Sequence, residues 1–144
     1  EAFKSPVVIL GSGDLGLIMA RQLKEQGHEI SLIVEKNPVP TAMARNRGIL
    51  SEIPIEFNSS ISSVNGEKRL ESVTIYNIET GASRSVPCST LLIAAGLKPD
   101  RTLLRGLEIT EDLICCGNCD KIYPMVEGLS ADAAQAATVL SERN

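Results

Sequence analysis

A glycine-rich turn between a buried strand and a helix constrains the fold of this chain more than any other feature. Residues 6–10 (PVVIL) are apolar and rich in β-branched side chains, which is typical of a strand buried on both faces of a parallel sheet. Residues 11–16 (GSGDLG) form the turn, a helix is predicted through Gln26, and residues 30–34 (ISLIV) form a second buried strand. Strand, helix and strand in this order predict a right-handed parallel crossover.

The turn matches the pattern G-x-G-x-x-G, whose three glycines have separate physical roles. Gly11 permits the tight turn, Gly13 lets the backbone approach a pyrophosphate, and Gly16 lets the helix pack closely on the strands. The pyrophosphate would bind unpaired amides at the positive end of the helix. A glycine turn used only for packing is the alternative. The strand–helix–strand context favours dinucleotide binding.

An acidic residue at the end of the second strand predicts which dinucleotide binds. Glu35 lies 24 positions beyond Gly11, close to the spacing of about 20 residues expected for the ribose-binding carboxylate. A carboxylate there accepts hydrogen bonds from the adenosine ribose of NAD and repels the 2′-phosphate of NADP. Lys36 could tolerate a phosphate, but no arginine cluster follows it. The sequence therefore favours NAD, against the alternative of a solvated strand end.

The remaining segments predict how the chain is completed. We expect a short helix that Thr41 caps and that runs to about Leu50. We also expect an antiparallel meander at about 60–88, because apolar residues alternate there between turn signals. Residues 90–96 predict another buried strand, 112–116 a last short strand and 130–141 a closing helix. The predicted fold is α/β, a Rossmann-like parallel sheet with helices on both faces and an antiparallel β-meander crossover.

Composition excludes several other classes of function. The chain has 144 residues, a net charge of −4 and 3% aromatic residues, which argues against nucleic-acid binding because that needs a basic face or stacking platforms. No apolar run approaches the roughly 20 residues of a membrane span. Three of the four cysteines fall within residues 115–119. Few, crowded cysteines favour reduced thiols and a cytoplasmic location.

Two further motifs give the chain a family resemblance. Residues 91–100 (LLIAAGLKPD) are a buried strand that ends at a glycine and turns at a proline, and residues 114–120 read ICCGNCD. Together with the glycine turn they resemble the A-x-G-x-x-P-D/N strand and the strand ending in Gly-Asp of the pyridine nucleotide–disulfide oxidoreductase family. The resemblance covers essentially the whole chain. It is specific in the three motifs and loose between them.

This resemblance implies an NAD-binding domain at 1–111 and a closing strand and helix at 112–144 that return into the FAD domain of a longer, flavin-dependent parent enzyme. The parent would pass hydride from NADH to FAD without a catalytic side chain or metal from this part, and the chain alone is expected to be inactive. The implied cofactor-binding residues are Gly11, Ser12, Gly13, Asp14, Leu15 and Gly16 around the pyrophosphate, Glu35 and Lys36 at the ribose, Ala95 and Gly96 towards the nicotinamide, and Gly117 and Asn118 facing the flavin.

Some features depart from the family pattern or leave alternatives open. The chain has no second G-x-G-x-x-G for the ADP part of FAD, and Asn118 replaces the usual Asp. Cys116 and Cys119 form a C-x-x-C for which a structural strand end is favoured over redox or metal use. A regulatory NAD-sensing module, such as an ion-channel gating domain, is the alternative function, disfavoured by the meander. The expected partners are NADH and the FAD domain, with a second copy of the chain as a further candidate.

Overall fold

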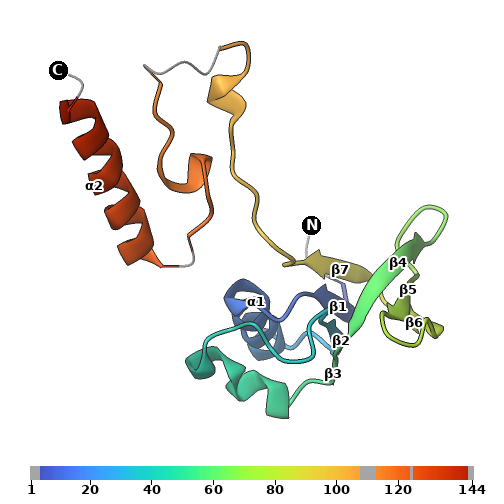
Figure 1. Cartoon of the computed structure of the whole chain (residues 1–144). Coiled ribbons are helices and arrows are strands. Elements are labelled where there is room, and N and C mark those ends of the chain that lie inside the picture. The colour runs from blue at the N-terminus through green and yellow to red at the C-terminus, as the bar shows by residue number, and fades with distance from the viewer. Residues whose placement is uncertain (1–3, 108–112, 124, 143–144) are drawn as a thin grey trace. The chain divides into compact units, whose positions relative to one another are not determined.

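The computed structural model describes residues 4–107, 113–123 and 125–142 (Figure 1). By its internal contacts the chain divides into two compact units, Glu1–Gly96 and Leu97–Asn144, and each is described by itself. The sequence analysis divided the chain between residues 111 and 112, where it expected a return into an FAD domain. That division is a different boundary from the one between the two compact units, and it stays a prediction.

A four-stranded parallel sheet forms the centre of the first unit. Its strands are β1 (Val7–Leu10), β2 (Ile30–Val34), β3 (Ile55–Glu56) and β7 (Thr90–Ile93), in the order β3-β2-β1-β7. Each neighbouring pair is parallel, so the predicted parallel crossover is confirmed. The strands are apolar because both faces of the sheet are covered.

Helical segments cover one face of this sheet. Helix α1 (Asp14–Glu25) buries a stripe at helical spacing, and a 3-10 helix, η1 (Ala44–Ser51), packs beside it. The sequence predicted Thr41 as the cap of this helix, and that position is wrong, because the N-cap is Met43. The backbone amides of Thr41 and Ala42 are directed to Ser12 in the glycine turn, so helical bonding begins only after them. The apolar cluster on this face contains Val7, Ile9, Leu17, Ala20, Leu23, Ile33, Ala42, Ile49 and Ile53.

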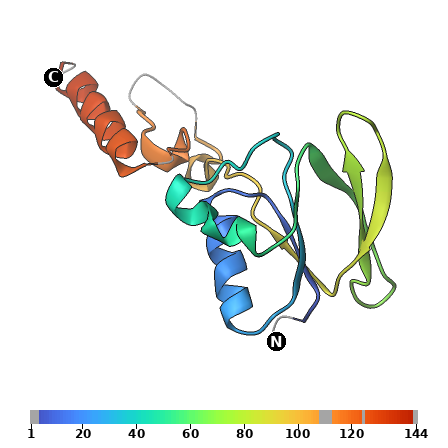
Figure 2. The same ribbon diagram turned by 90° about the horizontal axis from the view of Figure 1, so that it is seen from below.

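An antiparallel meander covers the opposite face, as Figure 2 shows. It consists of β4 (Ser59–Asn65), β5 (Ser72–Asn77) and β6 (Ser83–Pro87), paired in chain order, which confirms the predicted meander. The fold class is confirmed, but strands rather than helices cover this second face in the described part of the first unit. Alternating apolar residues give the meander one buried face, and this cluster contains Val8, Leu32, Val34, Val73, Ile75, Val86 and Cys88.

The second unit contains short 3-10 turns and one long helix. These are η2 (Thr102–Leu104), η3 (Gly117–Cys119) and α2 (Val126–Glu142). The expected strand at 112–116 is wrong for residues 113–116, which pair with no described strand. A strand needs a neighbouring strand for its backbone hydrogen bonds, and these residues have none among those described. Asp112 lies outside the described residues.

Helix α2 begins earlier than the predicted start at Ser130. The Ser130 hydroxyl donates to the carbonyl oxygen of Val126 (3.1 Å), so this serine lies inside the helix rather than at its cap. Among the helices that the structure describes, none is long and apolar enough to cross a membrane.

Candidate functional site

Two glycines of the turn are required by the close approach of backbone segments. Gly11 has a φ of +105°, and a Cβ there would lie 2.5 Å from the carbonyl oxygen of Ala94, directly after β7. A Cβ at Gly16 would collide with the carbonyl oxygen of Gly11. These glycines therefore let α1 and β7 pack against the end of β1, which matches their expected roles in the turn and in packing.

Packing does not require a glycine at position 13. Its φ of −70° suits any residue, and an added Cβ would meet only Thr41 Oγ1, at an ordinary contact distance of 3.7 Å. Gly13 is the N-cap of α1, whose first amides have no intrahelical acceptors. Leu17 is the first to find one, at Gly13 O (3.0 Å). The open space beside Gly13 is therefore bordered by free N–H groups suited to an anion.

Glu35 supports the same turn and is almost fully buried, with 3% of its surface exposed. One carboxylate oxygen accepts from Ser12 N (2.8 Å) and Ser12 Oγ (2.6 Å). The other accepts from Asn37 N (2.9 Å) and Asn37 Nδ2 (2.7 Å). Burial alone would raise the pKa of Glu35, but these hydrogen bonds outweigh it and lower the pKa. A fixed, ionised carboxylate therefore lies beside the turn, which is not the solvated strand end of the alternative interpretation.

The side chain of Asp14 faces η1. Its Oδ1 accepts from Asn46 Nδ2 (2.6 Å) and from Met43 N (3.0 Å). These bonds, led by the one from Asn46, lower the pKa of Asp14. Of the groups of Asp14, the backbone amide at the first position of α1 is thus the one suited to a pyrophosphate. Asn46 is itself buried, with 8% exposed, and sequence reasoning missed it.

Other predicted cofactor residues gather at the same sheet edge. Glu35 follows β2, and Ala95 and Gly96 follow β7, so they and the turn lie at the carboxyl ends of three adjacent parallel strands. Ala95, Gly96 and Lys36 are exposed, as is Leu15 in the first turn of α1. The crevice outside the carboxyl ends of such strands is the usual ligand site of open α/β sheets.

Gly117 and Asn118 lie in the second unit, and their contacts are internal to it. Gly117 N donates to Asp132 Oδ2 (2.5 Å), and Tyr123 N donates to Asn118 Oδ1 (3.2 Å). Nearby, the Cys119 thiol donates to the carbonyl oxygen of Cys116 (2.9 Å). All four cysteines are free thiols, and no group of three or more metal-ligating side chains occurs within the described residues.

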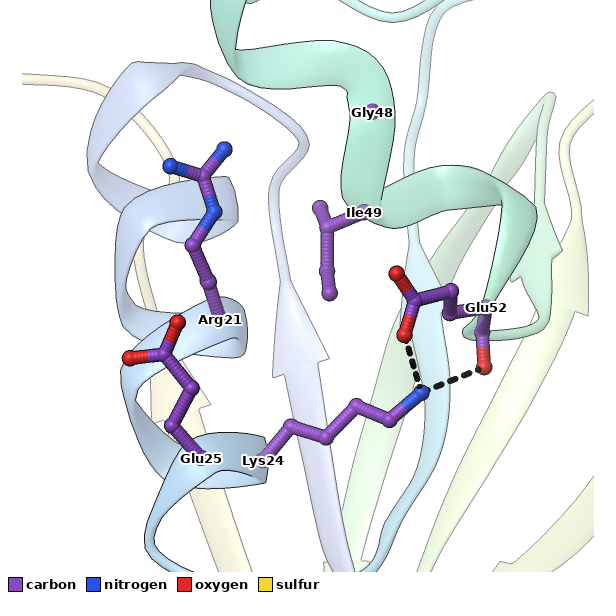
Figure 3. Close-up of a pocket in the computed structure, with 6 residues that line it drawn as sticks. All are labelled: Arg21, Lys24, Glu25, Gly48, Ile49 and Glu52. Carbon is purple, nitrogen blue, oxygen red and sulfur yellow. Dashed lines mark hydrogen bonds and ion pairs between the residues drawn. The ribbon is translucent and has the colours of Figure 1, made fainter.

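An open groove of about 550 Å³ lies between α1 and η1, away from the glycine turn (Figure 3). Lys24 and Glu52 form an ion pair across it, with Nζ 2.8 Å from Oε2. Both partners are substantially exposed, so the pair contributes little to stability. None of the residues predicted to bind a cofactor lines this groove, whose lining is Arg21, Lys24, Glu25, Gly48, Ile49 and Glu52.

Comparisons with known proteins relate the chain to one family. The family model described as pyridine nucleotide-disulphide oxidoreductase matches residues 2–118. A thioredoxin reductase of Dictyostelium discoideum is 29% identical over 108 residues, covering 74% of this chain and 34% of that protein. A thioredoxin reductase of Borreliella burgdorferi is also 29% identical, over 110 residues, covering 74% and 33%. The chain thus spans about a third of the length of these relatives.

Solved structures show the same fold. The Lactococcus lactis thioredoxin reductase matches with a TM-score of 0.73 and 18% identity, covering 94% of this chain and 53% of that one. The T. acidophilum thioredoxin reductase matches with a TM-score of 0.73 and 19% identity, covering 95% and 52%. The family model matches residues 2–118, and the sheet topology and the glycine turn agree with it. The chain therefore belongs to the pyridine nucleotide-disulphide oxidoreductase family.

Proposed function

We propose that this chain is the NAD(H)-binding part of a flavin-dependent oxidoreductase that passes hydride from NADH to FAD. The observation that carries the proposal is Gly13, a glycine that the protein's own packing does not need, beside free amides at the N-terminus of α1. Membership in the family and the thioredoxin reductase relatives support it. The alternative of an NAD-sensing channel module is not favoured, because these relatives are reductases.

Residues at different positions of the turn would bind different parts of the dinucleotide. The amides of Gly13, Asp14 and Leu15 would hold the diphosphate, and Glu35 would face the adenosine ribose. The Ser12–Glu35 hydrogen bonds hold the turn and the carboxylate in one arrangement, so little reorganisation is needed on binding. The nicotinamide supplies the hydride chemistry when bound, and the protein contributes orientation. No side chain of this chain is proposed to be catalytic.

The second unit is proposed to pack into the FAD domain of the parent enzyme, with Gly117 and Asn118 towards the flavin. None of its described residues is buried. Large apolar side chains, including Leu103 (93% exposed) and Val126 (66%), are left uncovered within it. A unit of this size without a core needs another surface to stabilise it. On this proposal the chain alone binds NADH and catalyses no turnover.

The fixed negative charge of Glu35 supports a preference for NADH over NADPH. Its carboxylate is ionised and fixed by four hydrogen bonds, so a 2′-phosphate on the ribose would meet a negative charge that cannot turn away. Lys36 is exposed and adjacent. Solvent screens the exposed Lys36 cation more strongly than the buried carboxylate, so Lys36 is not expected to offset Glu35.

Calorimetric titration of the chain with NADH and NADPH tests this preference. We expect tighter binding of NADH, and we expect Glu35→Arg or Glu35→Ser to narrow or reverse the difference. Because Glu35 also holds the turn, Glu35→Gln is the control that removes the charge at constant side-chain size. It also loses the hydrogen bonds that one carboxylate oxygen accepts, so circular dichroism checks that each variant folds. Equal affinities in the wild type, unchanged by Glu35→Gln, would contradict the proposed role.

A further inference from the structure

The loop after β2 folds back onto the glycine turn and is fixed there by two backbone amides. Ala42 N donates to Ser12 O (3.0 Å), and Met43 N donates to Asp14 Oδ1 (3.0 Å). Thr41 directly precedes this pair of contacts. Its position beside the turn is therefore set by the chain's own hydrogen bonds.

A buried side chain reinforces this arrangement. Asn46 Nδ2 donates to the same Oδ1 of Asp14 (2.6 Å), and Arg47 Nε donates to Ala42 O (2.7 Å). The Asp14 carboxylate thus has two donors directed at it from the loop and η1. These uncharged donors leave the carboxylate ionised, and they hold it against the loop and η1.

The hydroxyl of Thr41 borders the space that Gly13 leaves open. Thr41 Oγ1 lies 3.7 Å from the position a Cβ of Gly13 would take, and Thr41 is exposed. The backbone amide of Thr41 has a long contact with Ser12 Oγ (3.4 Å). None of the hydrogen bonds among the described residues uses the Thr41 hydroxyl, which is therefore available as a donor.

We propose that Thr41 is a further ligand of the dinucleotide, and that its hydroxyl donates a hydrogen bond to a diphosphate oxygen held beside Gly13. Asp14 and Asn46 are then positioning residues, because they fix the loop that carries Thr41. The inference rests on the proposed function and adds a side-chain donor from the loop after β2 to the backbone amides of α1. A hydroxyl donating to an anionic oxygen forms a charge-assisted bond, which is stronger than a neutral one.

Substitution of Thr41 in the full chain separates this contact from the rest of the site. Thr41→Val removes the hydroxyl with little change of shape, and Thr41→Ser keeps it. NADH, ADP and adenosine are titrated separately, and the thermal midpoint of each variant is measured. We expect Thr41→Val to weaken NADH and ADP binding about tenfold, the effect of one hydrogen bond to a charged group. Adenosine, which has no phosphate, should bind unchanged, and Thr41→Ser should bind NADH as the wild type does.

The outcomes distinguish this inference from the function on which it rests. If the wild type binds NADH and Thr41→Val binds it equally well, the inference is overturned and the proposed function stands. If Thr41→Val weakens adenosine as much as ADP, the hydroxyl contacts the nucleoside and the inference is again overturned. If the wild type binds neither NADH nor ADP, the proposed function itself fails.

The positioning role of Asn46 is tested by a double-mutant cycle. In an Asn46→Ala background the loop and η1 keep only the Met43 amide as a donor to Asp14, so Thr41 is held less firmly and Thr41→Val should weaken NADH binding less than it does in the wild type. Such non-additivity is expected of residues that act through one another. Full additivity of the two substitutions in a folded double variant would overturn the positioning role.

Discussion

The three glycines of the turn are needed for different physical reasons. Side chains at Gly11 and Gly16 would overlap backbone oxygen atoms, at Ala94 and Gly11 respectively. A Cβ at Gly13 would meet the protein only at an ordinary contact distance of 3.7 Å, at Thr41 Oγ1. Packing explains the first two glycines, and we assign the third to the approach of a bound diphosphate.

Matched valine substitutions separate these causes. We expect Gly13→Val to remove NADH binding while its thermal midpoint stays within a few degrees of the wild type, because the added side chain fills space that folding leaves open. Gly16→Val should lose stability strongly, because α1 must move away from the turn. Thermal melts and calorimetric titrations measure both effects. Wild-type NADH affinity in Gly13→Val would show that the turn is only a packing device.

At this scale the sequence predicted some contacts and not others. Glycine spacing and the acid at the end of β2 are local patterns, so the turn and Glu35 could be identified. The bond between Asp14 and Asn46 joins residues 32 positions apart, and it depends on how the intervening loop folds back. The same holds for the hydroxyl of Thr41 beside Gly13. No periodic pattern marks such contacts.

The elements predicted best are those whose hydrogen-bond partners lie close by in the sequence. The meander was recognisable because Val73, Ile75 and Val86 alternate with polar residues and share one buried face. Residues 113–116 have the composition of a strand, but they have no partner strand among the described residues. Apolar composition predicts burial, whereas a strand also requires a neighbour.

The meander should contribute substantially to the stability of the first unit. Ile75 is 1% exposed and packs in the cluster under the parallel sheet, whereas Ile78, just beyond β5, is 49% exposed. We expect Ile75→Ala to lower the free energy of unfolding by about 2–5 kcal/mol, as for other buried large-to-small changes. Ile78→Ala is the matched control, with an expected change within about 0.5 kcal/mol. Equal effects in urea denaturation would contradict the assigned packing.

For the whole molecule, the distribution of buried residues separates the two units. Every buried residue among those described belongs to Glu1–Gly96. That unit has a core on each face of its parallel sheet. The unit Leu97–Asn144 has a long helix without a buried residue. The first unit is therefore expected to bind nucleotide without help from the second, and the second is proposed to need the FAD domain.

The central claim is that the glycine turn of the first unit binds NADH, and an amide-resolved NMR titration of the isotope-labelled chain tests it most directly. We predict saturable, one-to-one shifts centred on the amides of Gly13, Leu15, Glu35 and Thr41, with none along α2. FAD added in the same way should give no stoichiometric complex, since the chain has one glycine turn of this kind. Absence of these shifts with NADH, or tight binding of FAD at the same amides, would contradict the claim.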